Sequence, residues 1–278
     1  MSEASPDPSA EPSPEPHAIF EHDGHVAVVT LNRPEKRNAL STEMLVRMYD
    51  AWVEIDSNPD IRVAVVTGAG GNFCSGADLK AMAGGYGDND NQWSERMAAD
   101  GDLHWKALLR HFIPNKPIIA AVEGYAVAGG TEILQAMDIR VAGESATFGV
   151  AEVRRGLFPL GGSTVRLSRQ IPYTVAADLL LTGRFVPAAE AKAVGLIGHV
   201  VPDGQALAKA HEIADTIAAN GPLAVQAVLR SMRATRELPE KEGLAMELEL
   251  GWPIFATEDA KEGPTAFAEK RAPNFRGR

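Results

Sequence analysis

The distribution of apolar and polar residues predicts alternating strands and helices over the first two-thirds of the chain. Residues His17 to Leu31 indicate a β-hairpin that turns at Asp23-Gly24, and the apolar runs Val63 to Val66 and Ile118 to Val122 indicate buried strands. A helix is expected from the Ser41 cap to about Ser57. Its apolar side chains recur at helical spacing and comprise Met44, Leu45, Met48, Trp52 and Ile55.

The remaining pattern becomes progressively helical toward the C-terminus. One helix is expected from about Ser94 to His111. Short strands are then expected at Ile139 to Ala142, Thr147 to Phe148 and His199 to Val201, with helices at Ser163 to Gln170, Tyr173 to Leu181 and after Val186-Pro187 as far as Gly195. From Asp203 the expected elements are helices at about Gly204 to Ala219, Pro222 to Arg236, Glu240 to Phe255 and Glu258 to Lys270. This order predicts an α/β core with a helical C-terminal appendage that self-associates.

Composition narrows the class of protein. The 278 residues have 45% hydrophobic content and a net charge of −10, which argues against a nucleic-acid partner. Residues Met1 to Pro16 are rich in Pro, Ser, Glu and Asp and predict a disordered tail rather than a signal peptide. The single cysteine, Cys74, allows no intrachain disulfide, and no apolar run reaches the ~18 residues of a membrane helix. We therefore expect a cytoplasmic protein that does not enter membranes.

One stretch, Val122 to Leu134, concentrates the candidate chemistry. A buried strand that ends at Val122 is followed by a turn that contains Gly124, Ala128, Gly129 and Gly130. A helical segment that contains Glu132 comes next. Such a turn directs backbone N–H groups toward a site for developing negative charge, with a carboxylate beside it. The alternative is that these glycines only permit a tight strand-to-helix turn. A second glycine-rich loop follows the strand that ends at Val66, and a polar loop spans Gly84 to Asn91.

Several familiar sites are excluded by their spacing. A dinucleotide fingerprint would need glycine at Phe73, and a phosphate-binding P-loop would need lysine at Gly130. The order Gly161-Gly162-Ser163 does not match a nucleophile elbow. The seven histidines form no metal-binding pair, so we expect no metal site. Cys74 is interpreted as a small buried residue rather than a catalytic thiol.

Four segments together resemble the crotonase (enoyl-CoA hydratase/isomerase) family, and the similarity covers nearly the whole chain from about His17. The tail Glu262 to Arg271 also resembles the family's C-terminal helix. The four segments are L-N-R-P-E-K-R-N-A-L at Leu31 to Leu40, N-F-C-S-G-A-D-L-K at Asn72 to Lys80, A-A-V-E-G-Y-A-V-A-G-G-T-E-I at Ala120 to Ile133, and A-T-F-G-V-A-E-V-R-R-G-L-F-P at Ala146 to Pro159.

The resemblance implies a fold and an assembly. It implies a crotonase-type ββα spiral core over residues 17–202, following the tail 1–16, and an all-helical oligomerisation region over residues 203–278. Members of the family form homotrimers, often paired into hexamers, so we expect self-association.

The resemblance also implies a catalytic centre. The backbone N–H groups of Ala77 and Gly129 match the family's oxyanion hole, which stabilises the enolate of an acyl-CoA thioester. Glu132 and Glu152 match the two glutamates that hold one water in the hydratases. Which glutamate is the acid and which the base stays open. Taken alone, Glu132 can instead be a carboxylate favoured by a helix N-terminus, and Glu152 the exposed start of a turn.

Further positions are implied to contact substrate. Lys36, Arg37 and Lys80 are candidates for the CoA phosphates, and Phe267 and Lys270 are implied to reach the ligand of a neighbouring subunit. Leu160 departs from the glycine that many hydratases have near this position, which indicates a reshaped acyl pocket. The other implied CoA or acyl contacts lie in the same motifs and are Ala39, Ser75, Gly76, Asp78, Leu79 and Tyr125.

The function expected from these features is hydration of a 2-enoyl-CoA. No separate cofactor is implied, because coenzyme A is part of the substrate. Another reaction of the family, such as Δ3-Δ2 isomerisation, thioester hydrolysis or decarboxylation, is the first alternative, and the presence of both glutamates favours hydration over it. A catalytically weak acyl-CoA-binding oligomer is the second. A bulky, steroid-like acyl group is a further hypothesis from the similarity to actinobacterial members.

Overall fold

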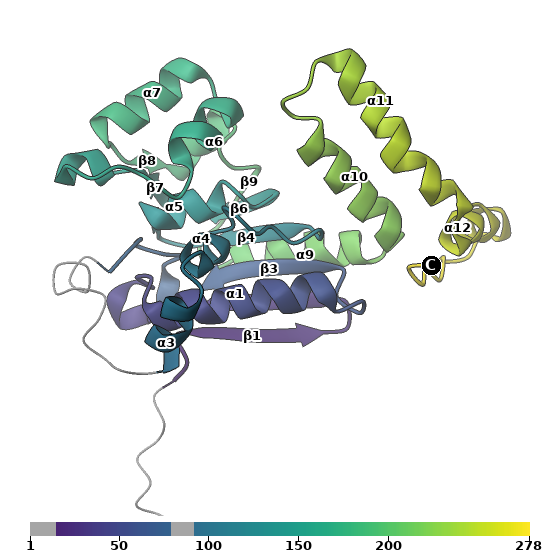
Figure 1. The fold of residues 1–278 in the computed structure, drawn as a ribbon, viewed down its shortest axis with the longest axis horizontal. Coiled ribbons are helices and arrows are strands. Elements are labelled where there is room, and N and C mark those ends of the chain that lie inside the picture. The colour runs from purple at the N-terminus through teal and green to yellow at the C-terminus, as the bar shows by residue number, and fades with distance from the viewer. Residues whose placement is uncertain (1–14, 79–91) are drawn as a thin grey trace, which may run out of the picture.

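The protein is organised around a six-stranded sheet and a smaller three-stranded sheet (Figure 1). The computed structural model describes residues 15–78 and 92–278. In the large sheet the order is β1-β2-β3-β4-β6-β9, with β1 and β2 antiparallel and all other neighbours parallel. Its strands are β1 (Ala18–Asp23), β2 (Val26–Leu31), β3 (Val63–Gly68), β4 (Ile118–Val122), β6 (Ile139–Gly143) and β9 (His199–Val201).

The two central strands, β3 over its first four residues and β4 throughout, are apolar because helices and loops cover both faces of the sheet. In β3, Ala64 and Val66 pack into the core beneath α1 (Thr42–Ser57), whereas Val63 and Val65 pack toward α9 (Ala206–Ala218). The alternating side chains therefore all reach apolar surroundings. The expected Ser41 cap of α1 is confirmed, since the Ser41 hydroxyl accepts a hydrogen bond from the Met44 amide at 3.2 Å.

The second sheet has the order β5-β7-β8 and lies beside the candidate chemistry. Its strands are β5 (Tyr125–Val127), β7 (Thr147–Gly149) and β8 (Val186–Pro187). The short helix α5 (Gly129–Leu134) begins two residues after β5, so the strand, turn and helix expected around Gly129 are present. Above this sheet lie η3 (Glu152–Arg155), α6 (Ser163–Gln170), α7 (Tyr173–Thr182) and α8 (Ala188–Ala193) (Figure 1).

The expectation of one continuous helix from Ser94 to His111 is wrong. The segment forms α3 (Gln92–Ala99) and α4 (Leu103–Ala107), which are separated by a turn at Asp100 to Asp102. The Asp100 side chain accepts a hydrogen bond from the Asp102 amide at 3.0 Å, and Gly101 lies between them. Such a local side-chain bond competes with the helical backbone bonds, and glycine in a helix interior weakens it further.

The last helices form an arm that projects from the layered body (Figure 1). The arm consists of α10 (Pro222–Ala234), α11 (Glu240–Gly251), η4 (Trp252–Ala256) and α12 (Glu258–Glu269). The helix expected to run to Phe255 thus ends at Gly251, and a 3-10 turn that includes Pro253 follows it. In contrast, α9 packs on the sheet through Ala206, Ala210 and Ala214. In the described part of the protein, no helix is both long and apolar enough to span a membrane.

The first family segment is joined to the second glycine-rich loop by one buried amide. Asn38 adopts a positive φ of 55°, and its Nδ2 donates to the carbonyl oxygens of Ala69 at 2.9 Å and Asn72 at 2.7 Å. Its Oδ1 accepts from the Arg33 amide at 2.8 Å. Asparagine tolerates this backbone conformation better than most residues. This side chain therefore helps to hold together two loops that flank the site, alongside backbone bonds such as the one from the Leu40 amide to the Gly76 carbonyl at 2.9 Å.

Replacing Asn38 with alanine is expected to destabilise the protein by on the order of 2–4 kcal/mol, because three buried backbone groups lose their partner. Urea unfolding of both proteins measures the loss. Asn220→Ala, at an exposed position before α10, is the control and is expected to unfold like wild type. Equal midpoints for Asn38→Ala and wild type would show that the loops are joined by other contacts.

Candidate active site

Most of the predicted catalytic groups line one largely apolar cavity of about 350 Å³. Its walls come from the loop before α1, from the second glycine-rich loop, from α4, from the start of α5 and from residues 151–161. Ala77, Gly129, Glu132 and Glu152 all line this cavity, together with Ser75 and Leu160. The apolar part of the lining consists of Leu40, Leu45, Trp105, Leu108, Val127, Ala128, Ala151, Leu157, Phe158 and Phe185.

The backbone amides of Ala77 and Gly129 lie close together in the lining of this cavity. A methyl group built on Gly76 would lie 3.0 Å from the Gly129 nitrogen, and one built on Gly129 would lie 3.8 Å from the Ala77 nitrogen. Among the described residues neither the Ala77 nor the Gly129 N–H donates to a protein acceptor. Ala128, at the turn between β5 and α5, has the unusual angles φ 50° and ψ −126°. This strained turn keeps the Gly129 amide outside both the strand ladder and the helix ladder.

The two adjacent glycines at the start of α5 have different surroundings. A side chain on Gly130 would overlap the Cys74 carbonyl oxygen and approach the Cys74 Cβ to 2.9 Å. A side chain on Gly129 would meet only the end of Leu40, at 3.2 Å, and Gly129 has no positive φ. Packing alone therefore requires glycine at 130 but not at 129, where an added side chain would project toward the Ala77 amide.

Glu132 is nearly buried, with 5% of its surface exposed. Its Oε1 accepts a hydrogen bond from the Ser163 amide at 3.3 Å, at the beginning of α6. Burial raises the pKa of the Glu132 carboxyl, while N–H groups of residues 161–163 and the Ser163 hydroxyl lower it. The donors offset part of the cost of burying the carboxylate, but burial is the larger effect and the pKa stays above its ordinary value.

Glu152 is partly buried at the start of η3 and has a contrasting environment. Its Oε2 is shielded from solvent and has no hydrogen-bond partner in the described structure. Burial and the nearby charge of Glu132 raise the pKa of Glu152 to about 7. The two carboxyl groups therefore interact, because the charge of Glu132 makes ionisation of Glu152 less favourable.

The raised pKa of Glu152 predicts a stability signature. Between the unfolded value near pH 4.3 and the folded value of about 7, only the folded protein holds this proton, so stability falls as pH rises. Glu152→Gln has no such proton to lose. The Tm of Glu152→Gln relative to wild type is expected to become more positive from about pH 5 to about pH 8. Thermal melts across this range test it, and a Tm difference that does not change with pH would contradict it.

The predicted basic loop lies beside the cavity rather than inside it. Ser75 connects them, because its amide donates to the Arg37 carbonyl at 3.0 Å and its hydroxyl to the Lys36 carbonyl at 3.2 Å. The side chains of Lys36 and Arg37 are exposed. The Arg37 guanidinium lies over the ring of Tyr125, 5.5 Å from its centroid. Tyr125 thus belongs to the same rim.

The other residues that were predicted to contact the substrate differ in where they lie. Asp78 forms an ion pair with Arg33 at 3.4 Å, and Arg33 also donates to the Ala39 carbonyl. Gly76 has a φ of 87°, and a side chain there would collide with Ala128. Leu79 and Lys80, together with the loop Gly84 to Asn91, lie outside the described residues. Phe267 lies on α12 of the arm and Lys270 directly follows this helix, and neither lines the cavity of its own chain.

Sequence reasoning missed several residues of the cavity and its surroundings. His104 and Trp105 of α4 contribute to its wall, and burial lowers the pKa of His104. Gly161 lies against Glu132, so that a Cβ at this position would approach the Glu132 carboxylate oxygen to 2.6 Å. The Ser163 amide donates a hydrogen bond to Glu132. The Gly161-Gly162-Ser163 order, rejected as a nucleophile elbow, contained the available signal: a flexible segment with a polar residue before a helix.

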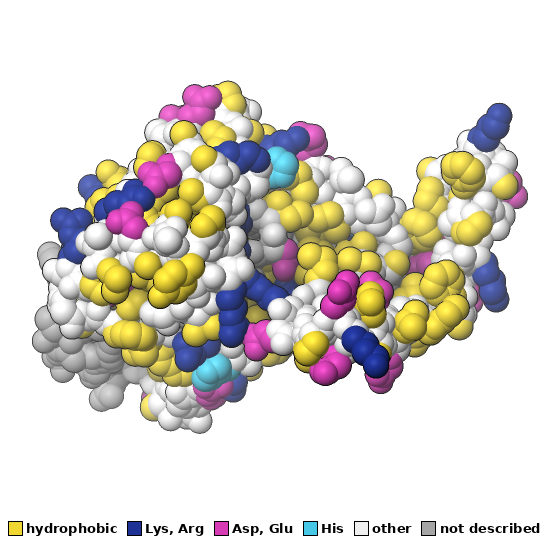
Figure 2. All heavy atoms as spheres, turned by 90° about the horizontal axis from the view of Figure 1, so that it is seen from above, with side chains coloured by type: hydrophobic (Ala, Val, Ile, Leu, Met, Phe, Trp, Pro, Cys, Tyr) yellow, Lys and Arg dark blue, Asp and Glu magenta, His cyan; other side chains and the backbone are white. Residues whose placement is uncertain are grey.

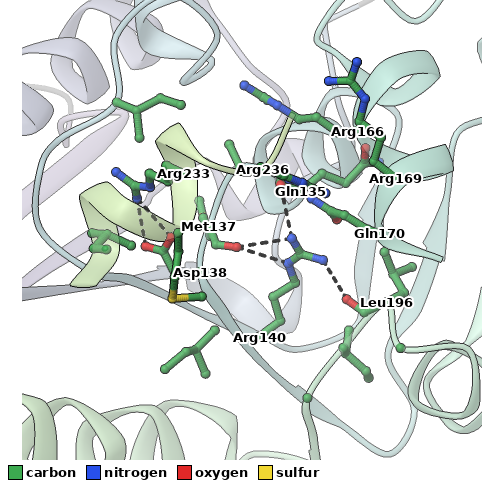
Figure 3. A pocket seen from close by; sticks show the side chains of 18 of the residues that line it. Gln135, Met137, Asp138, Arg140, Arg166, Arg169, Gln170, Leu196, Arg233 and Arg236 are labelled. Atoms are coloured by element: carbon green, nitrogen blue, oxygen red, sulfur yellow. Dashed lines mark hydrogen bonds and ion pairs between the residues drawn. The ribbon is translucent and has the colours of Figure 1, made fainter. Parts of the chain in front are cut away.

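A larger hollow of about 1050 Å³ is lined by residues 135–140 after α5, by α6, by residues 195–199 and by α10 (Figure 3). Its lining includes Arg140, Arg166, Arg169, Arg233 and Arg236. Arg140 donates to the carbonyl oxygens of Gln135, Met137 and Leu196, as Figure 3 shows, so its charge is used inside the fold. None of the predicted site residues lines this hollow. Size alone therefore does not identify the reactive centre.

Comparison with known proteins places the chain in a family. The enoyl-CoA hydratase/isomerase family pattern matches residues 21–278. Enoyl-CoA hydratase EchA19 of Mycobacterium tuberculosis is 59% identical over 95% of this chain and 97% of its own length. An (E)-benzylidenesuccinyl-CoA hydratase of Thauera aromatica is 41% identical, over 93% and 98%.

Solved structures agree with this assignment. The crystal structure of enoyl-CoA hydratase EchA1 from Mycobacterium marinum superposes with a TM-score of 0.86 at 40% identity, covering 95% of this chain and all of that one. An enoyl-CoA hydratase structure from Mycobacterium tuberculosis gives a TM-score of 0.85 at 39% identity, with 95% and 100% covered. The chain therefore belongs to the crotonase, or enoyl-CoA hydratase/isomerase, family and has its α/β fold, as the four sequence segments predicted.

Proposed function

We propose that the protein is an enoyl-CoA hydratase, which adds water across the α,β double bond of a 2-enoyl-CoA thioester. One observation carries the proposal: two interacting carboxyl groups, Glu132 and Glu152, line the same apolar cavity as the amides of Ala77 and Gly129, which have no acceptor among the described residues. The high identity to a hydratase supports the same reaction. Two glutamates with different proton affinities are the groups that addition of water requires.

In the proposed reaction the thioester carbonyl oxygen accepts hydrogen bonds from the Ala77 and Gly129 amides. One carboxylate takes a proton from water as the water oxygen bonds to Cβ, and the π electrons shift to form an enolate on the thioester. Cα then takes a proton from the acid partner. The donors around Glu132 favour its ionised form, and the unpartnered oxygen of Glu152 favours its protonated form. These environments support Glu132 as base and Glu152 as acid.

The coenzyme A portion of the bound substrate is proposed to extend out of the cavity past Ser75, toward Lys36, Arg37 and Tyr125. The backbone bonds from Ser75 to the carbonyl oxygens of Lys36 and Arg37 support this path, because they hold two cations at the cavity rim. Cations are suited to the phosphate groups of coenzyme A. Lys80 is proposed as a further phosphate contact. Leu160, at the cavity wall, is proposed to contact the acyl group.

The arm is proposed to mediate assembly into a homotrimer or hexamer. In α11 no described residue is buried within the single chain, and large apolar side chains are exposed along the arm (Figure 2). They include Leu244, Leu248, Trp252, Phe255 and Phe267, the last with 86% of its surface exposed. Exposed apolar surface of this kind favours association. Residues 203–278 are accordingly proposed as the oligomerisation region, and Phe267 and Lys270 as contacts to a neighbouring subunit's ligand.

The test is to incubate the wild-type protein with crotonyl-CoA and longer 2-enoyl-CoAs. Hydration is expected to remove the ultraviolet absorbance of the conjugated enoyl thioester and to yield the 3-hydroxyacyl-CoA. Release of free CoA thiol would instead indicate a hydrolase, and conversion of a 3-enoyl-CoA without hydration an isomerase. Tight binding of acyl-CoA with no turnover of any of these substrates would overturn the enzymatic proposal.

A further inference from the structure

A buried hydroxyl lies behind the turn that carries the Gly129 amide. Thr131 follows Gly129 by two residues on α5 and has 2% of its surface exposed. Its Oγ1 donates to the Ala126 carbonyl of β5 at 2.5 Å and accepts from the Gly149 amide of β7 at 3.2 Å. The Gly149 carbonyl oxygen is a further neighbour at 3.1 Å, but the one hydroxyl hydrogen is used by the shorter contact. Thr131 therefore ties the start of α5 to two strands of the small sheet.

Between the small sheet and α5 the chain passes through Ala128. Its φ of 50° and ψ of −126° are unusual for a residue with a side chain. Its amide donates to the Gly149 carbonyl at 2.7 Å, and its carbonyl accepts from the Glu132 amide at 3.0 Å. Strained backbone of this kind persists only where the surrounding contacts hold it. Thr131 adds the side-chain contact, because its hydroxyl fixes Ala126 and Gly149 on either side of the strained residue.

The conformation of Ala128 decides where the Gly129 N–H points. This N–H belongs to the peptide group between the two residues, and in a trans peptide the N–H and C=O point to opposite sides. The carbonyl of that group is bonded to the Glu132 amide, so the Gly129 N–H is directed away from α5. A rotation of the backbone at Ala128 would therefore change the direction of this donor.

The same turn also contacts the segment that carries the second donor, Ala77. A Cβ built on Gly76 would lie 2.7 Å from the Ala128 Cβ and 3.0 Å from the Gly129 nitrogen, so no side chain fits between them. The Leu40 amide donates to the Gly76 carbonyl at 2.9 Å and fixes the peptide group of the Ala77 N–H from its other side. The separation of the two donors thus depends on where Ala128 is held.

We propose that Thr131 is a positioning residue for the oxyanion hole: its hydroxyl holds the strained turn at Ala128 and thereby places the Gly129 amide for the thioester oxygen. This inference rests on the proposed function, which assigns the Ala77 and Gly129 amides to that oxygen. Thr131 does not line the catalytic cavity, so it acts through the turn and not on the substrate. Donors of this kind accelerate a reaction because they are fixed in place before it begins.

The kinetic test compares Thr131→Ser, Thr131→Ala and Thr131→Val in the hydration of crotonyl-CoA. Serine keeps the hydroxyl and is expected to keep a kcat near that of wild type. Alanine removes the hydroxyl and is expected to lower kcat about tenfold. Valine puts a methyl group where Oγ1 lies 2.5 Å from the Ala126 carbonyl, so it must displace the strand, and a loss of about 10²-fold is expected. KM is expected to change little, because bonds to the oxyanion strengthen in the transition state.

Thr67→Ala is the matched control. Thr67 of β3 is also a buried threonine whose hydroxyl donates to a strand carbonyl, that of Ala121 at 3.2 Å, but it belongs to the large sheet and does not line the cavity. Thr67→Ala and Thr131→Ala are both expected to lower Tm, because each leaves a buried group without its partner. Only Thr131→Ala is expected to lower kcat. Because alanine adds no bulk, this pair also decides the question if Thr131→Val does not fold.

A spectroscopic readout does not depend on turnover. The probe is p-dimethylaminocinnamoyl-CoA, a conjugated thioester that absorbs at longer wavelength when hydrogen bonds to its carbonyl oxygen polarise the conjugated system. Wild type, Thr131→Ser and Thr67→Ala are expected to shift the absorption of the bound probe to longer wavelength by the same amount. Thr131→Ala is expected to shift it less, and Thr131→Val least. A role of Thr131 in stability alone would leave the shift unchanged.

The outcomes separate the two proposals. A wild type that shifts the probe absorption but hydrates no enoyl-CoA contradicts the proposed reaction, and the shift in Thr131→Ala then decides the inference. An active wild type with unchanged kcat in Thr131→Ala and Thr131→Val overturns the inference alone, as does a loss of kcat with an unchanged shift. A wild type with neither activity nor a shift overturns both.

Discussion

Glu132→Gln is expected to lower kcat for enoyl-CoA hydration by roughly 10²–10⁴-fold, with KM changed much less. The amide is close in shape to the carboxylate and can keep the bond from the Ser163 amide, but it cannot take a proton from water. Glu152→Gln is expected to have a loss of similar order, because it removes the proton that the cavity holds to about pH 7. The double variant is expected to lose little more than the worse single variant, since the pair acts as one unit.

The control is Glu144→Gln, at an exposed turn between β6 and β7, for which wild-type kinetics are expected. The enoyl absorbance is followed to measure kcat and KM, and Tm is measured for each protein. The two measurements together distinguish a loss of catalysis from a loss of stability. Wild-type turnover in either Glu132→Gln or Glu152→Gln would exclude the two-glutamate mechanism. An equal loss of kcat and Tm would instead indicate that the substitution disturbs the core.

Gly129→Val is expected to lower kcat/KM by about 10²-fold or more, because its Cβ would lie 3.8 Å from the Ala77 nitrogen and its two methyl groups add bulk beside both amides. A carbonyl oxygen could then no longer accept from both donors. The first added atom meets only the flexible end of Leu40, so the fold is expected to tolerate the change. Gly129→Ala adds one carbon and is expected to have a smaller effect in the same direction.

Gly130→Ala provides the contrasting variant at the neighbouring position. Its Cβ would overlap the Cys74 carbonyl oxygen, so the expected result is a lower Tm. Steady-state kinetics and thermal melts of the three variants therefore distinguish a glycine that is needed for catalysis from one that is needed for packing. If Gly129→Val keeps wild-type kcat/KM, the Gly129 amide does not bind the reacting carbonyl.

The secondary structure was largely predictable because its signals are local. The Ser41 cap and the apolar strand Ile118 to Val122 appear where the pattern predicted them. The hairpin is also present, but Asp23 still pairs with Val26, so its turn is Gly24-His25, one residue later than predicted. The prediction failed between Ser94 and His111, where helical periodicity continues across Asp100 to Asp102. There a side-chain bond to the backbone and a glycine outweigh the periodicity, and a count of apolar positions does not detect this competition.

Some residues of the candidate site could be predicted from the sequence, and others could not. Glu132 could be selected from its own neighbourhood, since it follows a glycine-rich turn after a buried strand. Ala77 and Glu152 depended on resemblance to the family, because they lie 52 residues before Gly129 and 20 residues after Glu132 on separate segments. The roles of Ser163 and Thr131 were missed, since hydrogen bonds between segments that lie apart in the chain leave no periodic pattern in the sequence.

By itself the sequence determined the order of strands and helices, the strand–turn–helix around Gly129 and, through its motifs, the family. These depend on backbone conformation and on side-chain spacing within a few residues. Only the tertiary structure decided which glycine is needed for packing, that two carboxyl groups share one cavity, and that Glu132 has donors while Glu152 lacks one. The physical reason is that burial and distance control proton affinity, and both arise when segments far apart in the sequence pack together.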